Sequence, residues 1–258
     1  METINEIKRD TLAALMNAGK RGDNRGMMDY RKISVQMAPL QNPDGSALVS
    51  IGKSQVMAGV KFDIATPFAD RPDEGVLSTS ADLLPLASHL FETGPPSDES
   101  IELARVVDRG IRSSNTIDLK SFFLEEGKVM ALYIDLFILD HDGNLIDTAA
   151  LAAMSALLST RMPKVENAKI IRGEFSGKLP IKDKVVACTF GKLGAKPFLD
   201  PSLDEEKGMD GRLTIATTPS HICAGQKGRW GSFTEKDLME LSDIAMRKGN
   251  ELRALLSD

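Results

Sequence analysis

The segment from residue 128 to residue 160 limits the possible folds more than any other part of this sequence. It opens with KVMALYIDLFILD, a long apolar run typical of a strand, and continues through the turn DHDGN. It ends with TAALAAMSALLST, a helical run of small and apolar residues that must be buried on most of its sides. A chain of 258 residues, 42% of them hydrophobic, can form a core large enough for this.

Further elements are predicted on both sides of that segment. The run from Ile4 to Met16 spaces its apolar residues like one face of a helix, ended by nearby glycines. From Ser46, the runs SALVSI and QVMAGVKFDIA around a GKS turn predict a β-hairpin. The proline-rich stretch 66–100 predicts a loop. After Pro163, short strands are predicted around AKIIR, KVVACTF, RLTIATT and HICAGQKGRWG, followed by an amphipathic helix over 234–256.

The order of these elements predicts an α+β fold. Strands and helices do not strictly alternate, which disfavours a doubly wound parallel sheet. The fragments LVSIGKSQV and ACTFGKLGA each run from a strand into Gly-Lys, a weak indication that two halves arose by duplication. We predict a lead-in over 1–30 and two related subdomains over 31–164 and 165–258, packed as one unit.

Charge and cysteine content exclude several classes of protein. The formal charge of −5 disfavours a general nucleic-acid binder, so that any site for a polyanion must be local. Cys188 and Cys223 are too few for a disulfide framework, and they lack zinc-type spacing. The first residues mix acids and bases, and no apolar run reaches the ~18 residues of a membrane span. We therefore expect a cytoplasmic protein with no membrane contact, no metal and no cofactor.

The segment IELARVVDRGIRSS concentrates positive charge, with Arg105, Arg109 and Arg112 inside eight positions. Ser97 or Asp98, which follow two prolines, is a suitable N-cap for a helix through this segment. At 100° per residue the three arginines fall within an arc of roughly 60°, opposite the apolar residues. The helix is predicted to have a basic stripe and a buried back.

Two interpretations of this stripe fit the residues. Asp108 precedes Arg112 by four positions and Glu102 precedes Arg105 by three, so one interpretation is a solvated face with local ion pairs. The other is a ladder for a phosphate backbone, because a helical turn rises ~5.4 Å, comparable to the phosphate spacing of an extended strand. The planar fork of arginine suits phosphate oxygens. The spacing permits binding of single-stranded RNA without choosing between the two.

Longer motifs resemble those of one family. The segments PLAS, FE-x-GPP and ELARVVDRGIR, with GSALVSIGKSQVMAGVK before them and DGNLIDTAALAA and FLDPSLDEE after them, are similar to the RNase PH-like subunits of the archaeal exosome ring. In particular, they resemble the non-catalytic type of ring subunit. The motifs occur in order over nearly the whole chain, which makes the resemblance more specific than any single motif.

The resemblance implies both a fold and partners. The fold would be RNase PH-like and duplicated, and the assembly a hexameric ring of three heterodimers with single-stranded RNA threading its central channel. The partner would be a catalytic RNase PH-like subunit that uses inorganic phosphate to release nucleoside diphosphates from the RNA 3′ end, and RNA-binding cap proteins would sit on the ring. The resemblance also favours RNA binding by the stripe, with Arg109 first, then Arg105 and Arg112.

The phosphate site of active relatives is degenerate in this chain. Those relatives carry a pattern like DGGTRTA, in which a hydroxyl, an arginine and N–H groups at a helix start meet the anion. Residues 142–149 read DGNLIDTA, with one extra residue and with neither the hydroxyl nor the arginine in place. Leu145, Ile146 and Asp147 mark the altered site. We predict that Asp147 is the N-cap of a helix beginning at Thr148, where its carboxylate would repel phosphate.

The acidic segment FLDPSLDEEKGMDG corresponds to the loop that holds catalytic acids in active relatives. Its acids are Asp200, Asp204, Glu205, Glu206 and Asp210, and their spacing is shorter than in the active pattern. Acids mixed with proline and glycine are equally typical of an exposed turn, which is our prediction. Without the phosphate site a retained acid would be idle, so no catalytic residue is predicted.

The remaining polar candidates are predicted to have no chemical role. The histidines at 89, 141 and 221 do not cluster in the sequence. Trp230 could stack on a base, but a lone tryptophan after a hairpin is more typical of packing.

Three functions therefore compete. The first is a non-catalytic, RNA-binding ring subunit that structures the active site of its partner. The alternative is an active phosphorolytic 3′–5′ exoribonuclease, which would need another cation in place of the lost phosphate site. A third, a small-molecule kinase or isomerase-like enzyme, is disfavoured because the sequence has no P-loop or other Gly-rich phosphate motif.

Overall fold

The apolar run identified first in the sequence is the centre of a large sheet. In the computed structural model, which describes residues 2–256 and the side chains from residue 9, this run forms β6 (Lys128–Asp140). The sheet has the strand order β1-β2-β3-β6-β4, and the short β5 (Phe123–Glu125) also pairs with β6. The other strands are β1 (Ile33–Met37), β2 (Gly45–Ile51), β3 (Ser54–Ala65) and β4 (Val76–Leu83). All pairs are antiparallel except that of β4 with β6.

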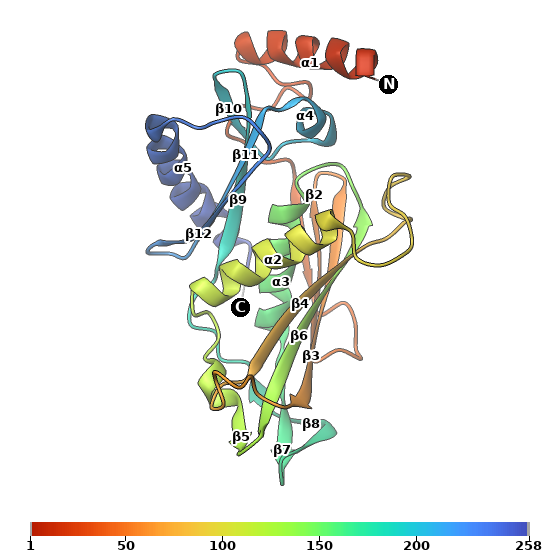
Figure 1. The fold of residues 1–258 in the computed structure, drawn as a ribbon, viewed down its shortest axis with the longest axis vertical. Coiled ribbons are helices and arrows are strands. Elements are labelled where there is room, and N and C mark those ends of the chain that lie inside the picture. The colour runs from red at the N-terminus through yellow and green to blue at the C-terminus, as the bar shows by residue number, and fades with distance from the viewer. Residues whose placement is uncertain (1, 257–258) are drawn as a thin grey trace.

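A second, four-stranded sheet is built from the C-terminal half. Its order is β10-β9-β11-β12, all antiparallel, from β9 (Val186–Leu193), β10 (Lys196–Leu199), β11 (Gly211–Thr217) and β12 (Ile222–Gly228). A separate hairpin of β7 (Arg161–Glu166) and β8 (Lys169–Lys178) projects from the end of the larger sheet, as Figure 1 shows. The long hairpin and the short C-terminal strands predicted from the sequence are confirmed.

Helices join the two sheets. α3 (Leu145–Ser159) lies in the centre of the molecule, where it contacts β2 and β3 of one sheet and β9 of the other (Figure 1). Most of its residues are fully buried because alanines let both sheets approach closely. α2 (Asp98–Ser113), followed by the short 3-10 helix η1 (Leu119–Phe122), contacts β4, α3 and β12. One continuous hydrophobic core includes residues of both sheets, so the two halves pack as one unit.

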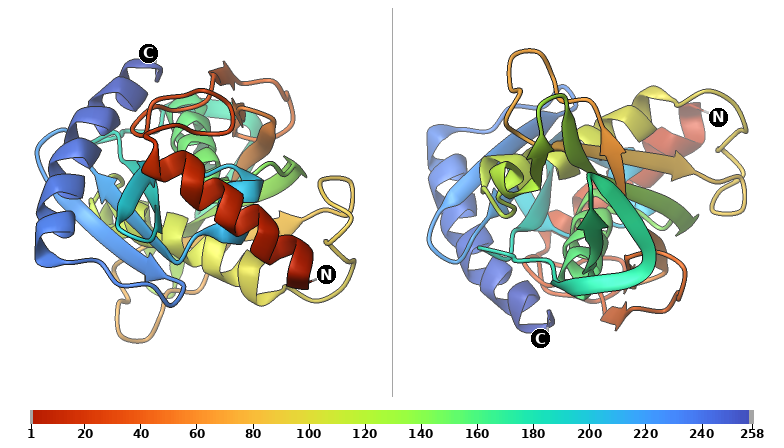
Figure 2. Two further views of the ribbon diagram at one scale, coloured as in Figure 1. Left: turned by 90° about the horizontal axis from the view of Figure 1, so that it is seen from above. Right: turned by 90° about the horizontal axis from the view of Figure 1, so that it is seen from below.

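The terminal helices cover the second sheet. α5 (Glu235–Ala254) packs on β9 and β11, and its N-cap Thr234 forms a capping box with Asp237. α1 (Glu2–Asn17) contacts α4 (Leu203–Gly208), and seen from above it lies across that end of the molecule (Figure 2, left). Met16 is buried with Phe198 and Met209, whereas the predicted apolar positions Ile4 and Ile7 lie outside the described side chains.

The proline-rich stretch predicted as a loop contains a strand, so that prediction is wrong for part of its length. β4 reads VLSTSADL, and three of its eight side chains are exposed. The run is too polar to indicate a strand by itself. It becomes one because its backbone pairs in parallel with β6 along its whole length.

The two Gly-Lys fragments do not mark equivalent positions. Gly52 has a φ of +62° and lies in the turn between β2 and β3. Gly191 lies inside β9, where a Cβ would come within 2.5 Å of the Phe198 ring. One glycine permits a left-handed turn and the other permits an aromatic ring to pack on a strand.

Candidate nucleic-acid interface

The predicted arginine helix is present with the predicted polarity. Ser97 caps α2 and accepts a hydrogen bond from Ser100 N at 3.3 Å, which confirms one of the two proposed caps. Arg105, Arg109 and Arg112 are all exposed. The opposite side of the helix is buried through Leu103, Ala104, Val107, Gly110 and Ile111.

The three arginines differ in their contacts. Arg112 donates from Nε to Asp108 Oδ2 at 2.6 Å and from Nη2 to the carbonyl oxygen of Leu77 on β4. It therefore ties the helix to the large sheet, as a local pair at i, i+4 would. Arg105 has no hydrogen bond or ion pair within the described part of the chain, because Glu102, its predicted partner, accepts from a different residue.

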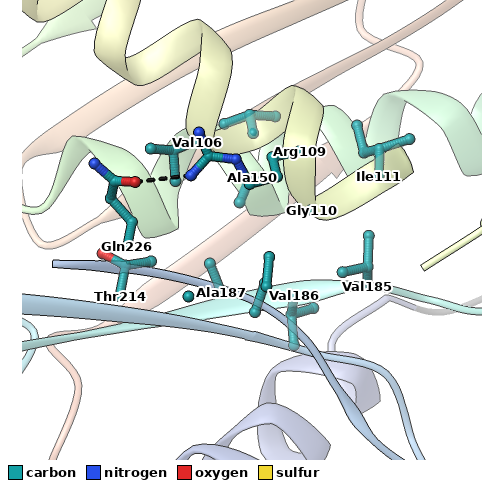
Figure 3. Close-up of a pocket in the computed structure, with 14 residues that line it drawn as sticks. Val106, Arg109, Gly110, Ile111, Ala150, Val185, Val186, Ala187, Thr214 and Gln226 are labelled. Carbon is teal, nitrogen blue, oxygen red and sulfur yellow. Dashed lines mark hydrogen bonds between the residues drawn. The ribbon is translucent and has the colours of Figure 1, made fainter. Parts of the chain in front are cut away.

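Arg109 is held by a residue that the sequence did not indicate. Its Nη1 donates to Gln226 Oε1 at 2.8 Å, across 117 positions of sequence, and links α2 to β12 (Figure 3). Arginine has five N–H donors, so this single bond fixes the guanidinium and leaves the others available. No local signal could have revealed Gln226, since it reaches Arg109 only when the two halves pack together.

An apolar cavity lies between α2 and the second sheet, next to Arg109. Its volume is about 20 Å³, enough for about one water molecule. Val185, Val186 and Ala187 line the side of the cavity opposite α2 (Figure 3). Such a space is too small for a nucleotide. Any ligand of that size would have to meet Arg109 on the outer surface of α2.

The start of α3 corrects the prediction for Asp147. The helix begins at Leu145, one turn earlier than expected, and its N-cap is Asn144, with a φ of 52° and no side-chain cap bond. Leu145 and Ile146 occupy the first turn. Asp147 is therefore inside the helix, and its side chain turns into the protein, where the residue is only 1% exposed.

Asp147 is an interior acceptor. Its Oδ2 accepts from Thr189 N, Tyr30 OH and Asn144 Nδ2, each at 2.9 Å, and its Oδ1 accepts from Thr189 Oγ1 at 2.7 Å. Burial raises the pKa of Asp147 to about 6, and these hydrogen bonds offset only part of that rise. The carboxylate joins α3 to β9 and to the lead-in segment, and it does not cap the helix.

A different carboxylate lies at the start of α3. Glu206 on α4 accepts from Asn144 N at 2.9 Å. Burial raises the pKa of Glu206, while the N–H of Asn144 and the charge of Arg212 act in the opposite direction. The carboxyl group predicted at this helix start is thus present, but Glu206 supplies it in place of Asp147.

The acidic segment is folded, so the prediction of an exposed turn is wrong. Residues 203–208 form α4, with a capping box between Ser202 and Glu205. Glu205 is 3% exposed and accepts from Nε and Nη2 of the fully buried Arg21 at 2.8 and 2.5 Å. This ion pair fixes the acidic helix against the lead-in that follows α1.

Asp200 belongs to a second buried ion pair. Its carboxylate accepts from Arg31 Nε and Nη2, from Arg25 Nη1 and from Asn144 Nδ2, all between 2.7 and 2.9 Å. Burial acts to raise the pKa of Asp200, but the hydrogen bonds and charge of Arg31 lower it below its ordinary value. Asp200 has structural partners on every side and none left for a substrate.

Of the remaining candidates, His141 lies beside the start of α3, where its Nδ1 accepts from Gly143 N at 3.4 Å and it lines the same cleft as Asn144 and Glu206. His141 stacks on Phe91 with ring centroids 5.3 Å apart, and the described residues contain no group of three His, Cys, Asp or Glu arranged to hold a metal ion. Trp230, predicted to pack, is 100% exposed, so that prediction is wrong. Across residues 2–256, none of the helices has the length and apolar character to cross a membrane.

Comparisons with known proteins agree with this architecture. The two domains of the 3′ exoribonuclease family match at residues 29–163 and 183–248. The exosome complex component Rrp42 of Thermococcus kodakarensis is 45% identical over 98% of this chain and 95% of its own length. That of Methanocella arvoryzae is 44% identical over 99% and 97%.

Solved structures give the same result. A chain of the Archaeoglobus fulgidus exosome with RNA bound to the active site superposes with a TM-score of 0.90 and 39% identity, covering 99% of this chain and all of that one. A chain of an archaeal exosome core gives 0.88 and 37%, covering 99% and 98%. The fold, both domain matches and the full-length relatives together place this chain in the RNase PH-like 3′ exoribonuclease family.

Proposed function

We propose that this chain is a non-catalytic ring subunit of a phosphorolytic 3′–5′ exoribonuclease complex. The observation that carries the proposal is the hydrogen bond between Asn144 N and Glu206. A phosphate nucleophile needs free N–H donors at the start of α3, and a carboxylate bonded there both competes for those donors and repels the anion. At ~4 Å the repulsion amounts to a few kcal/mol, about 4 at the effective dielectric of a protein surface.

The rest of the site agrees with an inert chain. Leu145 and Ile146 bring no hydroxyl or guanidinium to the first turn of α3. Asp200, the first acid of the acidic segment, is committed to arginines, and Glu205 to another. These ion pairs leave neither Asp200 nor Glu205 free to act as an acid or base.

RNA binding is assigned to two of the three arginines. Arg105 has no partner among the described residues, and Arg109 keeps most of its donors, so these two would contact phosphates. Arg112 already bonds within the protein, and its role is to hold α2 in place. The sequence predicted contacts by all three arginines, with Arg109 ranked first; the proposal keeps Arg109 and Arg105 as contacts and gives Arg112 a supporting role.

The relatives support the choice of partners. The curated relatives are components of exosome complexes, and one solved relative is a chain of an exosome with RNA bound to the active site. We infer that this chain alternates with a catalytic RNase PH-like subunit in a hexamer of three heterodimers, where its arginines hold single-stranded RNA beside the active site of the partner. Cap proteins would bind the ring, and the assembly would work in the cytoplasm.

Reconstitution with the catalytic subunit tests the proposal. The isolated chain should release no nucleoside diphosphate from RNA in phosphate buffer, and the mixture should degrade RNA. Changing Arg105 and Arg109 together to Ala should weaken RNA binding by the ring. Each lost phosphate contact reduces the slope of log K against log salt by about 0.7, so the double variant should lose about 1.4.

The controls separate binding from assembly. Arg247→Ala removes another exposed arginine, on α5, and should change neither the slope nor the decay rate. Size-exclusion chromatography should show an intact ring for every variant. An unchanged slope in the double variant would refute the arginine assignment, and phosphorolysis by the isolated chain would favour the alternative of an active enzyme.

A further inference from the structure

Trp230 is fully exposed to solvent, and it is the single tryptophan of the chain. It lies between the end of β12 at Gly228 and the N-cap of α5 at Thr234. A tryptophan side chain carries a large apolar surface, and full exposure leaves all of it in water. A free indole of this kind indicates a ligand.

The backbone holds Trp230 in this exposed position. Arg229 has a φ of 62°, uncommon for a bulky residue, and its carbonyl oxygen accepts from the Lys227 ammonium. Gly231 N donates to Asp210 O at 2.7 Å, and a Cβ on Gly231 would meet the backbone of Asp210 at the same distance. The indole therefore projects from a turn fixed on both sides.

The surroundings of Trp230 carry unpaired positive charge. The indole borders a cleft of about 630 Å³, a size that accepts small-molecule ligands. Two of the cations lining it are neutralised: Arg9 by Asp210, and Lys192 by an acid of α5, both at 2.6 Å. Lys207 and Arg229 also line the cleft, are exposed, and form no ion pair among the described residues.

We propose that Trp230, Arg229 and Lys207 form a second contact site for single-stranded RNA. A base would stack on the indole, and the neighbouring phosphates would lie at the two cations. Stacking on aromatic side chains beside a basic groove is how proteins hold single strands without reading their sequence. The proposal rests on RNA being the ligand of this chain, but on none of the arginines of α2.

A nucleotide fits this site better than a protein partner does. Tryptophans that anchor protein interfaces are enclosed by a ring of contacts that excludes water. Here the other lining residues are charged, glycine or serine, apart from Met209, which is only 4% exposed. One stacking surface and two free cations suffice for a nucleotide and not for a hydrophobic docking site.

The new site is separate from the arginine stripe. A cleft of about 360 Å³ lies between them, lined by Arg212 and Arg229 and also by the acids Glu99, Glu102 and Glu206. The acids interrupt the positive surface between α2 and Trp230. Each site can therefore be removed without touching the other.

Because the chain has one tryptophan, fluorescence excited at a wavelength that tyrosine does not absorb reports on Trp230 alone. Titration of the full chain with oligoadenylate should quench the emission, since a stacked base contacts the indole directly. An abasic oligonucleotide of equal length carries the phosphates without the bases and should leave the emission unchanged. RNA binding itself is followed by the anisotropy of a dye on the oligonucleotide.

Two variants of Trp230 measure how much its side chain contributes to RNA affinity. Trp230→Ala should weaken oligoadenylate binding about 5- to 160-fold, the range of stacking per base, with no change in unfolding because the side chain is fully exposed. Trp230→Phe should restore most of the affinity. Arg105→Ala should weaken binding yet retain the quenching, so the failure of one site is distinguishable from the failure of the other.

The proposal is overturned if saturating RNA, seen by anisotropy, leaves the emission unquenched, or if the abasic oligonucleotide quenches equally. A third outcome would assign Trp230 to a protein interface. With the residue replaced by 5-fluorotryptophan, its single ¹⁹F resonance should remain unshifted when the catalytic subunit is added and should shift when oligoadenylate follows. A shift with the subunit that abolishes the response to RNA refutes the RNA site.

Discussion

Replacing Asp147 by Asn tests whether that carboxylate is an interior charge and not a helix cap. The residue is 1% exposed and accepts four hydrogen bonds, but it has no ion pair within the described part of the chain. Asn is nearly isosteric. The Asn side-chain oxygen can keep the three hydrogen bonds that Oδ2 accepts, and its NH₂ group then faces the Thr189 hydroxyl. That hydroxyl can accept from the NH₂ group and donate to the Thr214 hydroxyl, 2.8 Å away.

The expected magnitude follows from the pKa. Burial raises the pKa of Asp147 from 3.8 to about 6, so between these values the folded chain holds the proton more tightly than the unfolded chain does. The free energy of unfolding therefore falls as the pH rises through this window. A difference of about two pKa units corresponds to about 3 kcal/mol, lost between about pH 4 and pH 7 and constant above that.

Asp147→Asn removes this loss because it keeps the side chain neutral at every pH. The variant should match the unaltered chain near pH 4 and exceed it by up to about 3 kcal/mol at pH 8. Urea denaturation of both proteins from pH 4 to pH 8 measures the difference. Asp200, whose pKa is lowered, produces the opposite trend in both proteins and cancels. A difference independent of pH, or a less stable variant at pH 8, would show that the carboxylate is not buried in this way.

Three further changes probe the frame around the sites. Arg112→Ala should lower the free energy of unfolding by about 1–2 kcal/mol, through one partly exposed ion pair and one hydrogen bond to β4, and should leave the salt dependence of RNA binding unchanged in a filter assay. Glu205→Ala leaves the Arg21 guanidinium buried without its partner, and should cost about 3–5 kcal/mol in urea denaturation. Gly45→Ala places a Cβ 2.6 Å from a backbone oxygen of α3 and should lower the free energy of unfolding by about 1–3 kcal/mol. Gly59→Ala, whose Cβ would have nothing within 4 Å, should lower it less, and equal losses would contradict the close approach of β2 to α3.

The arginine helix shows what the local sequence pattern can predict and what it cannot. The cap at Ser97, the basic stripe and the buried back all follow from residues within one helix, and the structure has them as predicted. The division of labour among the arginines does not follow from the pattern. It depends on Leu77 and Gln226, which lie on strands of two different sheets and meet the helix only after folding.

The start of α3 shows the opposite case. The prediction of a carboxyl group at the start of α3 is confirmed, but the prediction that Asp147 supplies it is wrong. The sequence places Asp147 next to the helix start, and Glu206 lies about sixty positions later. Only the packing of α4 on the DG turn brings Glu206 to Asn144, and only the left-handed backbone of Asn144 lets the helix begin a turn earlier.

The sequence by itself determined most of the strands and helices and which helix face carries charge, and it predicted that the anion site of active relatives is altered here. These are properties of neighbouring residues, set by periodicity and side-chain type. Tertiary structure alone decided that a polar stretch becomes β4, that Glu206 bonds the N-cap residue of α3, and that Trp230 is left in solvent. Those outcomes depend on which segments, distant in the sequence, pack against one another. That packing determines which strand pairs with β4, which donor Glu206 bonds and whether the indole is buried.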